Sequence, residues 1–343
     1  MFQYYTEGGN EMKKFTAIAS LPILFAFFFL MSCANKPAAP KAGSAKAEDM
    51  LSLLPKEAKG VIVVDIQRIM KTEAVDKAIK ENENYQQYQQ FVIETGIDPQ
   101  KDVYFFVAGM TGQVGGQNVE EGVALINLKY NRDLLLAKVK KERGELTETD
   151  YNGIKIYQAV QTPTQKPFNG AFLDDSNIVL GTDTAVKKVI DVTQKKAENV
   201  WKNEDLSALM KNSNKTAMVW GAFEVPAEIM QQAASKNPML GIFAGIKSIL
   251  LSFDYKDKSI LAEIKAMAPD EAKNKQMADA LNGFKALGAA AASKEPQAGE
   301  FLNKIEISAA ADHVKISAII PEELIKSLSQ KIKIQKSETK NEN

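Results

Sequence analysis

Few residues in this chain could carry acid–base or nucleophilic chemistry. Its 343 residues include one histidine and one cysteine, His313 and Cys33. Asp312 directly precedes His313, and a carboxylate beside an imidazole is the pair that a general base would need. Adjacent residues of a strand point to opposite faces, so the two side chains can meet only outside a regular strand. We therefore expect His313 to be a solvated residue of a turn between two strands.

Two groups of aspartates offer oxygen ligands for a cation. Asp174 and Asp175 are adjacent, and Asp254 and Asp257 lie close together further along the chain. Calcium loops of the EF-hand type need acidic or amide side chains at alternate positions followed by glycine, and neither group has that spacing. The sequence therefore predicts turns at these aspartates and no metal site.

The sequence lacks the motifs of common nucleophilic and phosphate-binding enzymes. It contains no Gly-x-Ser-x-Gly elbow, and a single histidine restricts Ser–His catalysis. The glycine-rich stretch from Gly109 to Gly116 has no Lys-Ser/Thr pair, so we expect a hairpin connection there instead of a phosphate loop. No cofactor is indicated, and a protein without catalytic activity is favoured. A hydrolase that uses carboxylates, such as a glycosidase, is an alternative.

The cysteine follows a short apolar segment near the N-terminus. Phe15–Met31 has no charged residue and comes directly after Lys13 and Lys14. Basic residues, an apolar core and small residues at its end are typical of a secretory signal peptide. The apolar segment is shorter than the roughly 20 residues that a membrane-spanning helix needs. We therefore predict a signal peptide over residues 12–32.

The end of this segment, Leu30-Met31-Ser32-Cys33, resembles the lipobox of bacterial lipoproteins. The resemblance implies cleavage between Ser32 and Cys33, a diacylglycerol thioether on Cys33 and a fatty acyl group, such as palmitate, on its new amino group. Met31 is larger than the usual residue. Several acyl chains hold a protein at a membrane, because each buried methylene contributes about 0.8 kcal/mol. Ala34 favours the outer membrane of the cell envelope over the inner membrane. The alternative is an ordinary thiol after a signal peptide or membrane anchor.

The segments on either side of the signal peptide differ in composition. Residues 1–11 contain acidic and aromatic side chains that do not belong ahead of a signal peptide, and Gly8-Gly9 can be encoded by a ribosome-binding sequence. We interpret residues 1–11 as a mistranslated leader and Met12 as the true start. Residues 33–49 are rich in Ala, Pro, Lys, Gly and Ser, which predicts a flexible tether.

The charge balance restricts the partners. Lysine plus arginine and aspartate plus glutamate number 43 each, so the net charge is zero. Nucleic-acid-binding proteins normally carry a basic surplus, so we expect no nucleic acid partner. The expected partners are a membrane, through the N-terminal lipid, and an unidentified protein or apolar ligand.

The rest of the chain alternates strand and amphipathic-helix patterns. We expect strands at residues 60–66, 103–108, 122–129, 154–160, 171–173, 178–180, 217–223, 247–254, 259–267, 303–309 and 314–319. Helices are expected at residues 72–95, 131–143 and 270–287, and from residues 182, 226 and 321 onward. In the helix at 270–287, we expect Met277, Leu281, Phe284 and Leu287 to face inward.

The recurring order strand–strand–helix predicts an α+β fold. We expect antiparallel sheets with helices on one face, arranged in two similar halves. The first half would span residues 50–225 and the second residues 226–330, followed by a charged tail over residues 331–343.

Part of the first half carries a motif of turns and caps. Its segments are Tyr151–Tyr157, Ala171–Asp175, Ile178–Thr182 and Ala185–Asp191, and Leu53-Leu54-Pro55 precedes them. Over residues 51–223 the chain resembles a family of uncharacterised bacterial secreted proteins and lipoproteins. Because the shared residues form turns and caps, the resemblance implies a fold and no catalytic residues.

An apolar surface is expected around a Pro/Gly break in the second half. Its residues are Met230, Met239, Leu240, Ile242 and Phe243. Methionine adapts to different shapes and is common at binding surfaces, so this surface could hold a lipid or a partner protein. The alternative is that it packs the two halves together.

The best overall interpretation is a lipid-anchored cell-envelope protein that acts as a non-enzymatic binding or structural module. A carrier or chaperone for apolar ligands, with a cleft between the halves, is an alternative.

Overall fold

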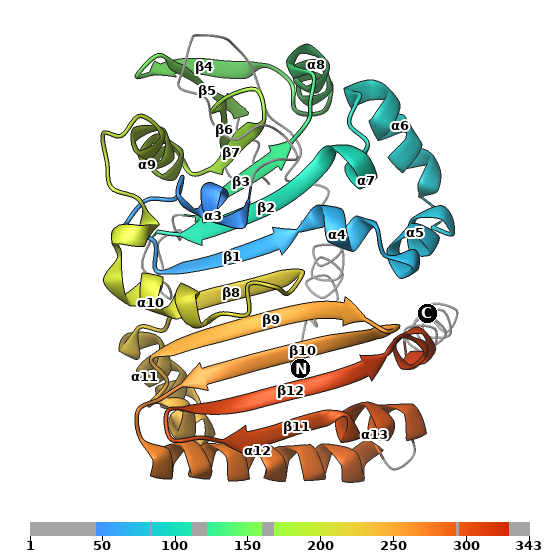
Figure 1. Ribbon diagram of the computed structural model, residues 1–343, viewed down its shortest axis with the longest axis vertical. Coiled ribbons are helices and arrows are strands. Elements are labelled where there is room, and N and C mark those ends of the chain that lie inside the picture. The colour runs from blue at the N-terminus through green and yellow to red at the C-terminus, as the bar shows by residue number, and fades with distance from the viewer. Residues whose placement is uncertain (1–45, 83, 112–121, 160–167, 293–294, 329–343) are drawn as a thin grey trace, which may run out of the picture.

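The computed structural model describes residues 46–328, apart from residues 83, 112–121, 160–167 and 293–294. Its strands form one twelve-stranded sheet in the order β11-β12-β10-β9-β8-β1-β2-β3-β7-β6-β5-β4 (Figure 1). Helices and this antiparallel sheet confirm the expected α+β class. The expected signal peptide, Ser32, Cys33, most of the expected tether and the charged tail lie outside the described residues. Within the described part of the chain, no helix is both long enough and apolar enough to span a bilayer.

The first half of the chain begins in the middle of the sheet. Three antiparallel strands come first, then a helix, and then four strands of which the last lies beside the third. The elements are α3 (Ala47–Leu51), β1 (Gly60–Asp65), α4 (Ile66–Met70), α5 (Glu73–Lys80), α6 (Tyr85–Thr95), α7 (Pro99–Asp102), β2 (Val103–Met110), β3 (Gly122–Leu128), α8 (Arg132–Arg143), β4 (Leu146–Tyr151), β5 (Ile154–Ala159), β6 (Asn169–Phe172), β7 (Asn177–Gly181), α9 (Asp183–Thr193), η1 (Val200–Lys202) and α10 (Glu204–Asn212).

The second half repeats this order with fewer strands. Three antiparallel strands are again followed by a helix, and the last strand, β12, lies beside the third, β10. The elements are β8 (Val219–Glu224), α11 (Ala227–Lys236), η2 (Pro238–Phe243), β9 (Ser248–Lys256), β10 (Ser259–Met267), α12 (Glu271–Ala291), α13 (Pro296–Asn303), β11 (Ile305–Ala309) and β12 (His313–Pro321).

The two halves meet where β1 pairs with β8, from Gly60 opposite Phe223 to Val64 opposite Val219. We expected separate sheets, and the structure has one continuous sheet. The boundary expected before Pro226 falls directly after β8 and therefore inside this sheet. The pairing is possible because β1 is apolar or glycine along almost its whole length, so neither of its faces needs water.

Helices cover both faces of the first half, where we expected helices on one face. On the side that we call the front, α3, α9 and α10 pack against strand residues such as Val63 and Val179. On the opposite side, the back, α6 and α8 pack against residues such as Ile126 and Leu180. The strand register defines the front and the back across the whole sheet, because the side chains of two paired residues in adjacent strands lie on the same face of the sheet. At the far end of the back, Met277 and Ala278 of α12 pack against Val314 of β12.

Several predicted helix ends are confirmed by their caps. The Thr182 side chain accepts a hydrogen bond from the Ala185 N–H at the start of α9, and the Asn131 side chain does the same for Leu134 in α8. Gly96 and Gly144 end α6 and α8 with positive φ angles of 68° and 84°, which suit glycine.

Three element predictions were wrong in detail. The helix expected at residues 72–95 is divided into α5 and α6, and the Asn82 side chain accepts a hydrogen bond from the Asn84 N–H at the break. Strand β4 was missed because its sequence, LTETDY, is polar. In α12, Phe284 and Leu287 are exposed, because the buried side of this helix runs through Asn274, Met277 and Ala278.

The two edge strands of the sheet, β11 and β4, differ in their surroundings. On β11, Lys285 Nζ donates a hydrogen bond to the Ile305 carbonyl oxygen at 2.7 Å, and Asn282 Nδ2 donates to the Ile307 carbonyl oxygen at 3.4 Å. Both donors come from α12. Strand β4 carries Glu148 and Asp150 at its exposed positions.

Ion pairs connect α6 with α8. Lys138 contacts Glu94, and Lys141 Nζ lies 2.6 Å from Glu94 Oε1. Hydrogen bonds from Lys138, Lys141 and Gln90 lower the pKa of Glu94 to about 2. A carboxyl group whose pKa is lower in the folded state stabilises the fold above its unfolded pKa, and this contribution is lost as the pH falls toward the folded value.

We therefore expect the Glu94→Gln substitution to reduce the urea midpoint at pH 6 more than at pH 3. Between these values, wild-type Glu94 begins to be protonated in the unfolded chain, so its contribution declines. Midpoints measured by circular dichroism at several pH values test this. Glu81→Gln is the control, because the ion pair of Glu81 with Lys77 is exposed on both sides. A Glu94→Gln effect of equal size at both pH values would contradict the prediction.

Candidate apolar binding face

The histidine lies where the turn after β11 enters β12. His313 Nδ1 is 2.7 Å from Asp312 Oδ1, and this contact lowers the pKa of the Asp312 carboxyl group. The two residues meet because Asp312 lies in the turn and not in the strand. Neither residue lines the groove between α10 and α11 or the smaller groove between α12 and β11.

The aspartates lie in turns or ion pairs. Asp174 lies between β6 and β7 and accepts hydrogen bonds from the backbone N–H groups of Ser176 and Asn177. Burial raises the pKa of Asp174 even so. Asp254 Oδ1 lies 3.2 Å from Arg68 Nη2, and Asp257 has a positive φ of 51° in the tight turn between β9 and β10. Within the described residues, no three His, Cys, Asp or Glu side chains are placed to share a metal ion.

The apolar residues expected at the Pro/Gly break come from α11 and η2. Met230 is half-buried on α11, and Phe243 packs against the core around Met277. Met239, Leu240 and Ile242 are exposed on η2. The five residues therefore share one excursion of the chain, but only Phe243 joins a described core cluster.

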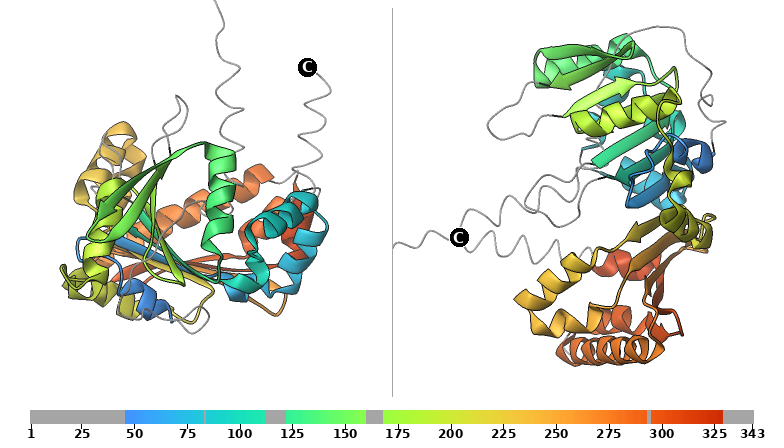
Figure 2. Two further views of the ribbon diagram at one scale, coloured as in Figure 1. Left: turned by 90° about the horizontal axis from the view of Figure 1, so that it is seen from above. Right: turned by 90° about the vertical axis from the view of Figure 1, so that its left-hand side faces the viewer.

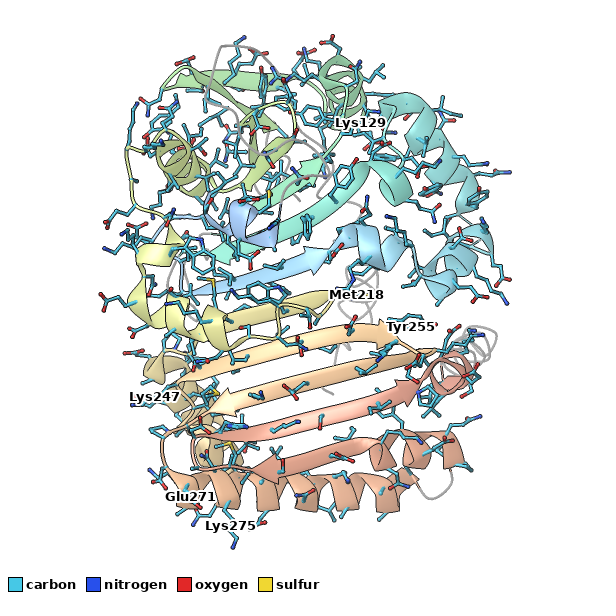
Figure 3. The ribbon with its side chains drawn as sticks, viewed as in Figure 1. Lys129, Met218, Lys247, Tyr255, Glu271 and Lys275 are labelled. Atoms are coloured by element: carbon cyan, nitrogen blue, oxygen red, sulfur yellow. The ribbon has the colours of Figure 1, made fainter. Side chains whose placement is uncertain are left out.

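A groove of about 1720 Å³ lies where the two halves meet, between α10 and α11. Its walls carry charged groups, including an ion pair of 2.8 Å between Lys59 and Glu224. Asn203 Nδ2 donates a hydrogen bond to the Ala58 carbonyl oxygen at 2.9 Å. Lys247, labelled at the start of β9 in Figure 3, also lines the groove. The walls therefore combine charged groups with apolar side chains such as Leu209, Val225 and Ile229.

The apolar surface of the molecule lies instead on the back of the sheet. Phe253 of β9 faces Val219 of β8 on one side and Ala262 of β10 on the other, and Ala262 faces Ala318 of β12. All four side chains therefore point to the back. The same register places further apolar residues there, and together they form the apolar sheet face: Ile62, Val219, Phe223, Leu251, Phe253, Ile260, Ala262, Ile264, Ile316 and Ala318.

The apolar sheet face lies between two cores and belongs to neither. The core under α8 ends at Val64 and Phe106, and the core under α12 begins at Ile249 and Ala266. Residues of the apolar sheet face are half-buried, and Phe253 is 37% exposed. Among the described elements, no helix makes extensive contact with β9 or β10. Figure 2 shows α8 rising from one end of this side of the sheet and α11 and α12 from the other.

Glycines make one part of this face flat. The Phe223 ring lies over Gly60 of the neighbouring strand β1 and over Gly221 of its own strand β8, and these two glycines leave room for it. A Cβ atom at Gly60 would come within 2.5 Å of the ring, and one at Gly221 within 2.7 Å. The observed position of the Phe223 ring therefore requires glycine at both positions.

Two apolar side chains of α12, Phe284 and Leu287, are exposed on one flank of the helix. Lys273 lies next to Gly245, just after η2, so its side of α12 is turned toward η2. Phe284 and Leu287 follow Lys273 by about three and four helical turns and share that side of the helix. Their exposure is thus explained by their position on the flank of α12, away from the buried stripe.

The front of the same strands has the opposite character. Lys265 and Lys315 lie 3.2 Å and 2.9 Å from the carboxylate of Glu263, which is therefore shared by two lysines. Ile319, which pairs with Leu261 of β10, also lies on this side and is 62% exposed. The second half of the sheet thus presents a charged front and an apolar back.

The apolar sheet face could bind an apolar ligand, but its side chains carry no reactive group. The apolar sheet face contains no titratable, nucleophilic or metal-binding side chain, so it cannot transfer a proton or form a covalent intermediate. Burial of apolar surface contributes about 25 cal/mol per Å², so a long hydrocarbon chain is the ligand that it would hold best.

The sequence of β10 indicates that one face of the strand is buried, but it does not indicate that this face binds a ligand. In β10, apolar Ile260, Ala262, Ile264 and Ala266 occupy alternate positions, and Glu263 and Lys265 lie between them, which is typical of a strand with one buried face. Sequence reasoning located the apolar surface on η2 because methionines cluster there. The sheet face was missed because its residues come from strands that are distant in sequence.

Comparison with known proteins gives a family without an assigned activity. The fold is similar to crystal form III of TP0453, with 10% identity, a TM-score of 0.45, and coverage of 81% of this chain and 96% of that chain. Crystal form I of TP0453 gives 10% identity and a TM-score of 0.45, with 82% and 96% covered. No curated protein matches the sequence significantly. A family model described as "Protein of unknown function (DUF3352)" matches residues 126–337.

Proposed function

From the premise that this chain belongs to DUF3352, a family of proteins of unknown function, we propose that it is a lipid-anchored protein of the bacterial cell envelope that binds an apolar ligand without catalysis. The expected resemblance covered residues 51–223, whereas the family match covers residues 126–337 and includes the whole of the second half. All residues of the apolar sheet face except Ile62 of β1 lie within this match.

The apolar sheet face is the observation that carries the proposal. Monomeric proteins rarely leave large contiguous apolar surfaces uncovered, and those that do use them as interaction sites. Here the face spans β1, β8, β9, β10 and β12 and joins no described core. A fatty acyl chain fits it, because such a chain is linear and each buried methylene contributes about 0.8 kcal/mol.

The N-terminal anchor supports the choice of ligand. The lipobox-like residues predict acylation at Cys33, and the described domain starts at Lys46. The intervening residues, if fully extended, reach about 45 Å. The domain would therefore stay close to a membrane, where lipids with free or exposed acyl chains are concentrated. The outer membrane, seen from the periplasm or the surface, is the proposed location.

The Phe253→Glu substitution tests the site. It places a carboxylate in the middle of the apolar sheet face, at a position exposed enough for the fold to accept it. We expect binding of a pyrene-labelled fatty acid, measured by fluorescence titration, to weaken at least tenfold. The protein used starts at Ala34 and so retains every described element.

The matched control is Ile319→Glu, which adds the same charge on the front of the same sheet. We expect the control to bind within twofold of the parent protein, and circular dichroism should show that both variants are folded. Equal loss in both variants, or no binding by the parent protein, would contradict the proposed ligand class. Mass spectrometry of lipids that co-purify with the intact protein would identify the natural ligand.

A further inference from the structure

The segment between β8 and β9 leaves the sheet. Helix α11 and the 3-10 helix η2 pack against each other, and η2 also touches α12. Both elements stand away from the back of the sheet, as the right-hand view of Figure 2 shows. This excursion ends in three exposed apolar side chains, Met239, Leu240 and Ile242, which we call the apolar tip.

The apolar tip is held by a defined turn. Asn237 Oδ1 accepts a hydrogen bond from the Met239 N–H at 3.1 Å, and the Asn237 carbonyl oxygen accepts one from the Leu240 N–H at 2.9 Å. Phe243, at the end of η2, packs into the core around Met277. The chain is thus secured on both sides of the tip. Met239 itself is 61% exposed, so the turn displays apolar groups that folding leaves uncovered.

The charged residues close to the apolar tip in sequence are all lysines. Residues 229–253 contain Lys236 and Lys247 and no acidic residue, in a chain whose net charge is zero. Lys273 of α12 lies beside Gly245 and adds a cation that is 3.7 Å from Asp270. Exposed apolar side chains flanked by lysines match the interface of a bilayer that contains anionic phospholipids.

We propose that the apolar tip enters the surface of an anionic phospholipid bilayer and so orients the anchored domain. The inference rests on the lipid anchor at Cys33, because the anchor keeps the tip within a tether length of the bilayer and raises its effective concentration there. It does not depend on a ligand at the apolar sheet face.

The single cysteine of the chain makes this proposal testable in the full-length protein. The Met239→Cys variant carries a thiol at the tip, and the Ile319→Cys variant carries one at a similarly exposed position on the front of the sheet. Each is labelled with a small polarity-sensitive fluorophore in vesicles of phosphatidylethanolamine and phosphatidylglycerol. Leu240→Cys and Ile242→Cys provide further tip positions if one variant fails to fold.

At position 239 we expect a blue-shifted emission and at least a twofold loss of fluorescence when the lipids carry a quencher. At position 319 we expect neither change. Replacing phosphatidylglycerol by a neutral lipid should reduce the quenching at position 239. Equal quenching at both positions overturns the proposal. A blue shift at position 239 without lipid quenching also overturns it, because a protein surface, such as a second copy, would then cover the tip.

The unsubstituted chain reports on the anchor separately. If Cys33 is acylated, this chain has no free thiol and takes up no label. Labelling of the unsubstituted chain would contradict the anchor, whereas an unlabelled chain with an unquenched tip would contradict the tip contact alone. Neither result bears on the separate proposal that the apolar sheet face binds a fatty acid.

Discussion

Replacing Cys33 by alanine is expected to leave the protein as an unprocessed precursor without lipid. The residues Leu30-Met31-Ser32-Cys33 resemble a lipobox, in which cleavage follows the addition of the diacylglycerol to the cysteine thiol. Without the thiol, no thioether forms and the signal peptide is retained. Metabolic labelling with a radioactive fatty acid should give a strong band for the parent protein and none for the variant. Immunoblotting should show the corresponding increase in mass.

The control for this experiment is Ser32→Ala, which keeps a small residue before the cysteine. It should be labelled and processed like the parent protein. Anchoring by several acyl chains is stable, whereas a single chain gives marginal binding. Normal processing and fatty acid labelling of the Cys33→Ala variant would refute the anchor, and with it the proposed location in the envelope.

The Asn274→Leu substitution is expected to destabilise the second half by about 2–4 kcal/mol, because it removes a donor that is shared by three buried or partly buried carbonyl groups. Asn274 is fully buried in α12. Its Nδ2 donates to the carbonyl oxygens of Ala268 at 2.8 Å, Ala310 at 3.1 Å and Ala311 at 3.2 Å. One side chain thus connects α12 to the end of β10 and to the turn between β11 and β12. Leucine has the same number of side-chain heavy atoms and the same branch point, but it leaves these carbonyl groups without that donor.

Urea unfolding measures this difference, and Asn282→Leu on the same helix provides the comparison. Asn282 Nδ2 donates to the Ile307 carbonyl oxygen at 3.4 Å in an exposed position, where water can replace it. We expect its substitution to change the free energy of unfolding by less than about 0.5 kcal/mol. Equal effects of the two substitutions would show that Asn274 does not secure α12.

Local features of this fold could be predicted from the sequence. The β9–β10 hairpin was expected, and in the structure its turn residues, Asp257 and Lys258, have positive φ angles of 51° and 54°. These are the angles that a two-residue turn requires to match the twist of its strands. Caps such as Thr182 and stops such as Gly144 were predictable for the same reason, since the residue that makes the structure is part of the element.

Features that depend on distant partners could not be predicted in this way. The pairing of β1 with β8 joins residues more than 150 positions apart, and nothing in either strand identifies the other. The inward side of α12 was misjudged because Phe284 and Leu287 suit a buried stripe, but the sheet lies under Asn274 and Met277. The location of the apolar sheet face likewise depends on which strands the helices leave uncovered.

If the protein is anchored to a membrane as proposed, the two edges of the sheet gain a second importance. An anchored protein diffuses in two dimensions, so its copies meet far more often than at the same amount in solution. Free strand edges would then join sheet to sheet. Lys285 and Asn282 already occupy carbonyl groups of β11, and two β4 strands would bring Glu148 and Asp150 of each copy together. Under the proposed anchoring, we therefore expect the wide sheet to stay unpolymerised even where copies are crowded at the membrane.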